Sequence, residues 1–262
     1  NGAAKIRINP GNIGGPDRLR QVVDLAKQHS IAIRVGVNSG SLQKDLVEKY
    51  NGVTPEALAE SGIKAVELVE SCGYDQIILS VKSSDPAMTI AVYRLMAKQC
   101  DYPLHLGVTE AGTPGTGSIR SAVGIGTLLA EGIGDTIRVS LTGDPVAEVQ
   151  AAKAILNALG LKQTGPTLVS CPTCGRTQVG LVDIAAEVES KLAHLTYPIK
   201  VAVMGCAVNG PGEARDADVG IAGGDGRFLI FADGEPKYQV EEAQAVDALM
   251  AMIEELHQEG RF

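Results

Sequence analysis

The stretch Gln76-Ile-Ile-Leu-Ser-Val-Lys82 is a short apolar run that ends in a lysine, and Asp85-Pro86 follows it closely. Such a run, rich in aliphatic and β-branched residues and bounded by polar ones, predicts a β-strand. The Asp-Pro pair predicts a helix start, because aspartate is a favoured N-cap and proline is favoured at the first helical position. The stretch therefore predicts one strand–helix unit.

The same pattern recurs through residues 1–160. Further strands are predicted at residues 6–9, 31–37, 104–108 and 136–141. Thr54-Pro55 and Asp144-Pro145 predict two more helix starts, and helices are expected over residues 16–29 and 146–159. Strand–helix alternation at this spacing predicts an α/β fold with a parallel sheet, either a barrel or a doubly wound sheet. We count five units, whereas a closed barrel of this type needs eight.

Polar side chains end these strands with matching parity. Residues two apart share one face of a strand, and α/β proteins build their sites at the carboxyl ends of strands. The cations are Arg7, Arg34, Lys82 and Arg138, and the carboxylate is Glu110. Any one of them could be a surface charge or half of an ion pair, but four cations cannot all pair with one carboxylate. The excess predicts a multiply charged anionic ligand, and the arginine fork suits a diphosphate.

Residues 112–126 are rich in glycine and resemble a phosphate-binding loop. The stretch lacks the P-loop spacing and the lysine that follows its last glycine. We therefore expect a flexible loop that leads into a helix.

A second, smaller domain is expected over residues 161–262, after a partial barrel over residues 1–160. The change comes at a Lys-, Gly- and Pro-containing linker between Leu161 and Thr167. The predicted elements are strands 167–170, 199–204, 217–222 and 227–231 and helices 181–195 and 240–258.

Three cysteines and a carboxylate of this domain have the spacing of a metal centre. Cys171-Pro-Thr-Cys174 places two thiols three residues apart, Cys206 follows a predicted strand, and Glu213 ends the Gly-Pro-Gly loop after it. The set could hold an iron–sulfur cluster. Cys171 and Cys174 could instead form a thioredoxin-type redox pair, which leaves Cys206 without a role.

A structural zinc is the other reading of these thiols. Zinc normally takes four cysteine or histidine ligands, and His194 could be the fourth, although its position inside a predicted helix favours an ordinary histidine. Spacing alone does not separate zinc from a cluster. Cys72 and Cys100 are expected to be buried free thiols.

Composition excludes several classes of protein. The net charge is −8 and the isoelectric point is about 5.1, which argues against general binding to nucleic acids or membrane surfaces. No apolar run approaches the length of a membrane span, and the first residues lack a signal-peptide pattern. An odd count of five cysteines favours a thiol-reduced, cytoplasmic protein.

Seven motifs occur in order and together resemble the 4-hydroxy-3-methylbut-2-enyl diphosphate synthase family of the non-mevalonate isoprenoid pathway. They are Arg-Ile-Asn-Pro-Gly-Asn-Ile-Gly, Arg-x-Gly-Val-Asn-x-Gly-Ser-Leu, Val-Lys-x-Ser-Asp, His-Leu-Gly-x-Thr-Glu-Ala-Gly, Glu-Gly-Ile-Gly-Asp-Thr-x-Arg-Val-Ser-Leu, Cys-Pro-Thr-Cys and Gly-Cys-x-Val-Asn-Gly-Pro-Gly-Glu. The resemblance extends from Lys5 to about Gly224.

The resemblance implies a TIM-barrel-type domain followed by a small α/β domain with a [4Fe-4S] cluster. Its ligands would be Cys171, Cys174, Cys206 and Glu213. The implied substrate is 2-C-methyl-D-erythritol 2,4-cyclodiphosphate, which is opened and reductively dehydrated with two electrons. By position, the residues that match diphosphate- or pocket-lining residues of the family are Arg7, Arg34, Asn38, Lys82, Arg138, Ser140 and Asn209.

Two carboxylates would be catalytic by the same resemblance. Glu110 would supply or steer a proton as the hydroxyl leaves as water, and Glu213 would leave the iron as substrate binds, because a carboxylate is a weaker ligand for cluster iron than a thiolate. Flavodoxin or ferredoxin would donate the electrons, and the family assembles as homodimers. About three barrel units of the family precede the segment with which this sequence starts, so we expect a truncated form. The alternative is a non-catalytic protein with a structural zinc at the three cysteines.

Overall fold

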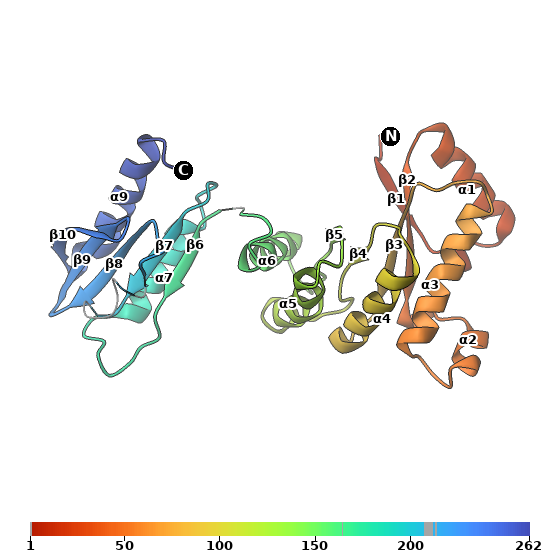
Figure 1. Ribbon diagram of the computed structural model, residues 1–262, viewed down its shortest axis with the longest axis horizontal. Helices are drawn as coiled ribbons and strands as arrows, with labels where there is room; N and C mark the ends of the chain where they lie inside the picture. The colour runs from red at the N-terminus through yellow and green to blue at the C-terminus, as the bar shows by residue number, and fades with distance from the viewer. Residues whose placement is uncertain (1, 164, 207–211, 213) are drawn as a thin grey trace. The chain divides into compact units, whose positions relative to one another are not determined.

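The computed structural model describes residues 2–163, 165–206, 212 and 214–262 (Figure 1). The chain divides into two compact units, Asn1–Leu161 and Lys162–Phe262. The strands of the first unit are β1 Lys5–Ile8, β2 Ala32–Asn38, β3 Ile77–Lys82, β4 His105–Leu106 and β5 Thr136–Ile137. Its α-helices are α1 Pro16–Gln28, α2 Lys44–Lys49, α3 Pro55–Glu70, α4 Pro86–Gln99, α5 Pro114–Ala130 and α6 Pro145–Ala158.

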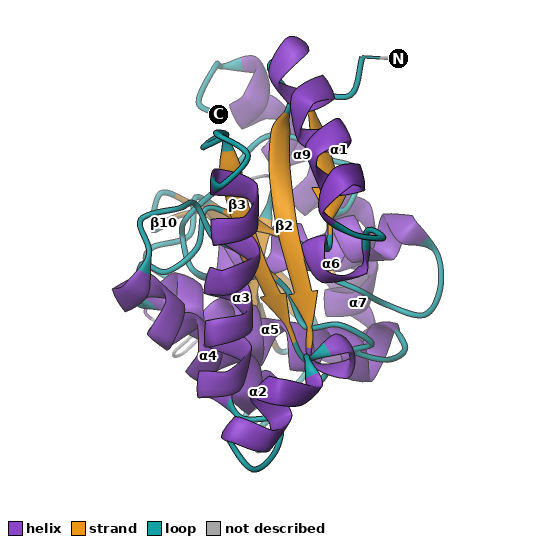
Figure 2. Cartoon of the chain, turned by 90° about the vertical axis from the view of Figure 1, so that its right-hand side faces the viewer, coloured by secondary structure: helices purple, strands orange, loops and turns teal. Residues whose placement is uncertain are grey.

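The five strands of the first unit are parallel and adjacent in chain order. Strands β1, β2 and β3 form one sheet, and β4 pairs with β5. A single parallel bridge between Leu79 and Leu104 joins β3 to β4. Helices α1 and α3 pack against β2, and α4 packs against β3 (Figure 2). The expected barrel-type α/β fold is thus confirmed as a run of five strand–helix units, and the described strands form no closed barrel.

Helix starts follow the predicted capping signals. The hydroxyl of Thr54 accepts a hydrogen bond from the amide of Ala57, and the Asp85 and Asp144 carboxylates accept from Ala87 and Val146. Each of these helices has proline at its first position, as the sequence predicts.

One expectation for the first unit is right only in part. A flexible loop that leads into a helix was predicted for residues 112–126, and the helix is present, but it begins at Pro114, so most of this stretch belongs to α5. Small residues allow this glycine-rich helix to pack closely. A Cβ added to Gly117 would lie 2.6 Å from the Leu141 side chain, and one added to Gly124 would lie 2.6 Å from that of Val108, so neither position has room for a larger residue. Tertiary packing therefore outweighs the low helix propensity of glycine.

The second unit is a five-stranded sheet covered on one face by two helices. Its elements are β6 Thr167–Ser170, α7 Leu181–Leu192, β7 Lys200–Met204, β8 Val219–Gly224, β9 Arg227–Ala232, β10 Glu235–Glu241 and α9 Ala245–Gln258. The strand order is β10-β9-β8-β7-β6, with β6, β7 and β8 parallel and β9 and β10 antiparallel to their neighbours. Helices α7 and α9 bury their apolar faces against it.

Strand β10 was not expected from the sequence. The predicted helix over residues 240–258 begins only at Ala245, and residues 235–241 form an exposed edge strand. Proline and charged residues are tolerated on an edge strand because one side of its backbone faces solvent. None of the described helices has both the length and the apolar character that a membrane crossing requires.

Candidate functional site

The cation-rich face of the first unit is set by strand register. Arg7 lies directly opposite Arg34 across β1 and β2, and Asn38 lies opposite Lys82 across β2 and β3. The bridge between Leu79 and Leu104 aligns β3 with β4, and β4 pairs in register with β5. By this alignment the same face continues from Lys82 through Gly107 to Arg138. Since residues two apart point to the same side, the four predicted cations project from one face of the five strands.

Two glycines make room for two of these cations. A Cβ on Gly36 would lie 2.6 Å from Nε of Arg7, whose guanidinium donates a hydrogen bond to the Gly36 carbonyl at 3.2 Å. A Cβ on Gly107 would lie 2.8 Å from the Arg138 carbonyl oxygen and 3.5 Å from Nζ of Lys82. The long side chains therefore lie over bare backbone, where a larger residue would displace them.

Gly107→Ala is expected to lower the free energy of unfolding by about 1–3 kcal/mol, since the atom nearest the added methyl group belongs to backbone that cannot swing away. Chemical denaturation measures the change. Gly126→Ala is the matched control, because a Cβ there meets no atom within 4 Å, and in the interior of α5 it should stabilise by up to about 1 kcal/mol. An unchanged Gly107→Ala stability would contradict the packing described.

The cations lie close enough for their charges to act on one another. Lys82 is only 6% exposed, and burial, with Arg138, Arg34 and Arg7 nearby, lowers its pKa to about 7. Burial lowers the pKa of Arg34 as well, helped by Arg7 and Arg138. Among the described residues none of the four cations forms an ion pair within 4 Å. We call Arg7, Arg34, Lys82 and Arg138 the cation cluster.

The two predicted polar neighbours of the cluster are partly buried, and Glu110 is not. Asn38 ends β2 and Ser140 follows β5, and both are half-buried. Glu110 lies in the turn after β4, is exposed and has a φ of 53°, which non-glycine residues adopt rarely. The carboxylate whose charge acts on Lys82 is instead that of Glu148 in α6.

His105 is a buried histidine on the same strand face. It begins the motif His-Leu-Gly-x-Thr-Glu-Ala-Gly, but the sequence alone assigned it no role. Its Nδ1 lies 2.8 Å from the Thr136 hydroxyl, and its buried Nε2 has no hydrogen-bond partner among the described residues. Burial, with Arg34, Lys82, Lys5 and Arg138 around it, lowers its pKa to about 3. The ring is therefore neutral near neutral pH, and a polar residue inside a predicted strand was the signal that could have identified it.

Because the folded pKa of His105 lies below the unfolded value, the unfolded state binds more protons below about pH 6.5 and the folded state loses stability there. We expect wild type to lose about 2 kcal/mol relative to His105→Asn between about pH 7 and 4.5. Denaturation at several pH values measures this difference. Equal pH dependence in the two proteins would show that His105 is not buried as a neutral ring.

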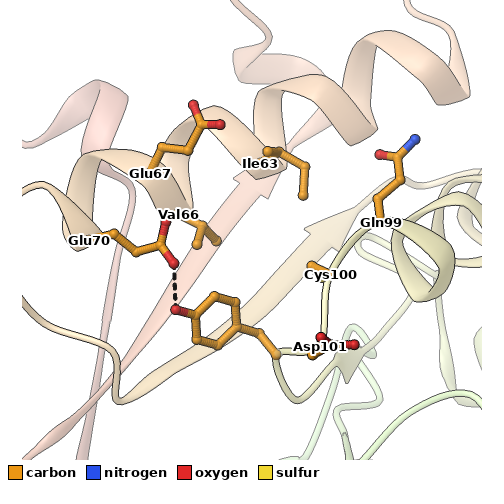
Figure 3. A pocket seen from close by; sticks show the side chains of 8 residues that line it. Ile63, Val66, Glu67, Glu70, Gln99, Cys100 and Asp101 are labelled. Carbon is orange, nitrogen blue, oxygen red and sulfur yellow. Dashed lines mark hydrogen bonds between the residues drawn. The ribbon is translucent and has the colours of Figure 1, made fainter.

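A hollow on the helical side of this unit is a poor alternative for an anion. It has a volume of about 390 Å³ and lies between the carboxyl ends of α3 and α4, beside the half-buried Cys100. Glu67, Glu70 and Asp101 line it, and Tyr102 donates a hydrogen bond to Glu70 (Figure 3). Three carboxylates would repel a diphosphate, so the cation cluster is the better anion site.

In the second unit, two of the predicted thiols follow neighbouring parallel strands. Cys171 follows β6 and Cys206 comes two residues after β7. The Cys171 amide donates to the Val203 carbonyl at 3.3 Å, and the Cys171 Sγ accepts a hydrogen bond from the Gly205 amide at 3.2 Å. These two bonds hold the Cys171 loop against the residue that precedes Cys206.

Cys174 is exposed and belongs to a turn closed by Thr177. The Cys174 amide donates to the Thr177 hydroxyl at 3.1 Å, and a Cβ on Gly205 would lie 3.1 Å from that side chain. Hydrogen bonds from Arg176 and Thr177 lower the pKa of the Cys174 thiol, which favours the thiolate that metals bind. None of the five cysteines is in a disulfide.

The donor set fits a metal centre in its chemistry and in the closeness of its loops. Cys171, Cys174 and Cys206 are free thiols on segments that meet at Gly205. Within the described residues, no three cysteine, histidine or acidic side chains already gather as a bound metal ion would require. The predicted ligand Glu213 and the predicted pocket residue Asn209 lie outside the described residues.

Both units match one protein family. Residues 1–153 match the family model described as the GcpE TIM-barrel domain, and residues 167–255 match that of the GcpE protein C-terminal domain. The chain belongs to the GcpE family. This confirms the resemblance drawn from the motifs, and the curated relatives described next are named as enzymes.

Curated GcpE relatives are more than half identical to this chain. The protein of Caldanaerobacter subterraneus subsp. tengcongensis is 54% identical over 259 residues, which cover 99% of this chain and 73% of that protein. Those of Ruminiclostridium cellulolyticum and Clostridium perfringens are each 56% identical, over 98% and 97% of this chain and 72% and 73% of theirs. All three are named 4-hydroxy-3-methylbut-2-en-1-yl diphosphate synthase (flavodoxin).

Proposed function

We propose that this protein is a synthase that converts 2-C-methyl-D-erythritol 2,4-cyclodiphosphate into 4-hydroxy-3-methylbut-2-enyl diphosphate, in isoprenoid biosynthesis. The observation that carries the proposal is the cation cluster, in which a buried lysine and three arginines share one strand face without an ion-pair partner among the described residues. A cyclic diphosphate would supply the missing negative charge, and the names of the relatives specify a diphosphate product.

In this proposal the cation cluster binds and orients the diphosphate. Arg7 and Arg34, in register on neighbouring strands, present two guanidinium groups, each able to hold two phosphate oxygens. Lys82 and Arg138 add positive charge on the same face, from the end of β3 and the residue after β5. Asn38 and Ser140 offer neutral hydrogen-bonding groups near the carboxyl ends of the strands. These contacts would anchor the end of the substrate that does not react.

The overall reaction consumes two electrons and two protons for each substrate. One carbon–oxygen bond of the ring breaks while the diphosphate remains attached at its other end, a neighbouring hydroxyl leaves as water, and a carbon–carbon double bond forms. Glu110 would supply or steer a proton to the departing hydroxyl. Its exposed position in the turn after β4 is compatible with a group that exchanges protons with solvent.

A [4Fe-4S] cluster held by Cys171, Cys174, Cys206 and Glu213 would supply the electrons one at a time and a Lewis-acidic iron. The support from this chain is that three free thiols lie on segments joined at Gly205 and that hydrogen bonds from Arg176 and Thr177 lower the pKa of the Cys174 thiol. The name of the relatives gives flavodoxin as the electron donor, and ferredoxin would serve the same purpose. We also propose a cytoplasmic homodimer.

The first test is the visible absorption and metal content of protein purified without oxygen. We expect a brown protein with a broad absorption band that dithionite bleaches and about four irons per chain. The full-length, cluster-loaded enzyme should then convert the cyclodiphosphate when reduced flavodoxin is supplied. A colourless protein with one tightly bound zinc at the three cysteines would refute the proposed chemistry.

A further inference from the structure

The turn after β5 is fastened to α6 by a carboxylate that the sequence analysis did not select. The Leu141 amide donates a hydrogen bond to Oε1 of Glu148 at 2.8 Å. Glu148 lies in the first turn of α6, just after the N-cap Asp144. The turn between β5 and α6 contains Ser140 and follows Arg138. Both are predicted diphosphate-binding residues.

Two further contacts tie this turn to the loop that follows β4 and to helix α5, which follows that loop. The Thr142 amide donates to the Gly112 carbonyl at 2.8 Å. The Leu141 side chain fills the space beside Gly117, where an added Cβ would lie 2.6 Å from it. The turn that contains Ser140 and the loop that contains Glu110 are therefore held as one piece.

Glu148 also acts on the cation cluster through its charge. It is the carboxylate that opposes the lowering of the Lys82 pKa by burial and by the surrounding arginines. The charged or titratable groups that act on Lys82 or are acted on by it come from β1, β2, β4, the residue after β5, and α6: Arg7, Arg34, His105, Arg138 and Glu148. Within this set Glu148 is the acidic member.

We propose that Glu148 is a positioning residue for the reaction proposed above, because it fixes the turn that contains Ser140 and partly balances the charge of the cation cluster. The inference rests on the proposed function for its catalytic consequence. The two parts of the role separate chemically: the hydrogen bond needs only an acceptor oxygen, whereas the balance needs a negative charge.

The test compares Glu148→Gln and Glu148→Ala in the full-length, cluster-loaded enzyme. Glu148→Ala removes the acceptor and the charge, and should raise KM for the cyclodiphosphate about tenfold even at about pH 6.5, with a smaller change in kcat. Glu148→Gln keeps an acceptor for the Leu141 amide. It should restore KM at about pH 6.5 and move the alkaline limb of kcat/KM to lower pH, because Lys82 then loses its proton more easily.

Hydrogen exchange gives a readout that does not depend on turnover. Residues 139–144 should exchange faster in Glu148→Ala and at the wild-type rate in Glu148→Gln. Glu56→Ala is the matched control, since Glu56 also lies in the first turn of a helix but far along the chain from these loops. Wild-type KM, pH profile and exchange in Glu148→Ala would overturn the inference, as would a glutamine variant that behaves like alanine.

The two failures are distinguishable. If the wild-type enzyme does not convert the cyclodiphosphate, the proposed function is wrong, whereas the exchange rates still decide whether Glu148 holds the turn. If wild type is active and the Glu148 variants match Glu56→Ala in every readout, the function stands and the role of Glu148 is refuted.

Discussion

Replacing Lys82 with methionine is expected to stabilise the folded protein and at the same time to abolish tight diphosphate binding. Lys82 is 6% exposed, lies among three guanidinium groups and has no ion-pair partner within 4 Å among the described residues. Methionine has a similar length and adapts to irregular space without a charge. Denaturation at about pH 7 should show a gain of the order of 3 kcal/mol in the free energy of unfolding.

The pH dependence of that gain follows from the lowered pKa. Lys82 titrates near 7 in the folded protein but near its usual 10.5 when unfolded, so the unfolded state binds the extra proton between these values. Wild-type stability from this group therefore rises with pH in that window, and the advantage of Lys82→Met should shrink from about pH 7 to 10. Cyclodiphosphate affinity should fall roughly a hundredfold or more, which calorimetry or KM would measure.

Lys98→Met is the matched control for this experiment. Lys98 is exposed in the last turn of α4, so its replacement should change stability by no more than about 0.5 kcal/mol and leave binding unaltered. A Lys82→Met protein that is less stable than wild type would show that the lysine has a partner that balances its charge. A stabilised variant that still binds diphosphate tightly would remove Lys82 from the site.

If the proposed cluster is present, replacing Cys171 with serine is expected to remove it while the fold of the second unit persists. Serine retains an acceptor for the Gly205 amide, which now donates to the Cys171 sulfur, but it is a poor ligand for cluster iron. Iron and acid-labile sulfide per chain should fall severalfold and the visible band should disappear. Turnover of the cyclodiphosphate should fall by about three orders of magnitude or more, because the proposed mechanism delivers its electrons through the cluster.

Cys100→Ser provides the control thiol. Cys100 is half-buried, is not in a disulfide and belongs to the other unit, so its replacement should leave iron, colour and turnover close to wild type. Retention of iron by Cys171→Ser, or loss of iron from Cys100→Ser, would contradict the ligand set. Circular dichroism of both variants checks that the fold is intact.

Features that depend on local sequence could be predicted. The parity of Arg7, Arg34, Lys82 and Arg138 in their strands placed them on one face, and strand register brings Arg7 opposite Arg34 as that parity requires. The Asp-Pro and Thr-Pro pairs placed the helix starts, since an N-cap and its partner are only a few residues apart.

Features that depend on contacts between residues far apart in the chain could not be predicted from the sequence. Glu148 looked like any acidic residue in a first helical turn, and its role emerges from a bond to Leu141. His105 differs from an ordinary strand residue through the positive groups that other strands place around it. The length of α5 and the edge strand β10 are set by packing and sheet position that outweigh local propensity.

The pairing of Arg7 with Arg34 has a consequence for the amino-terminal strand. Like charges directly opposite each other across two strands repel, and salt screens that repulsion. Among the described residues strand β1 pairs with β2 alone, so in the chain of residues 1–262 it should detach more readily at low ionic strength than at high. Protease cleavage within β1 of this chain should accordingly slow as salt is added, and phosphate should protect the strand at lower concentrations than chloride does.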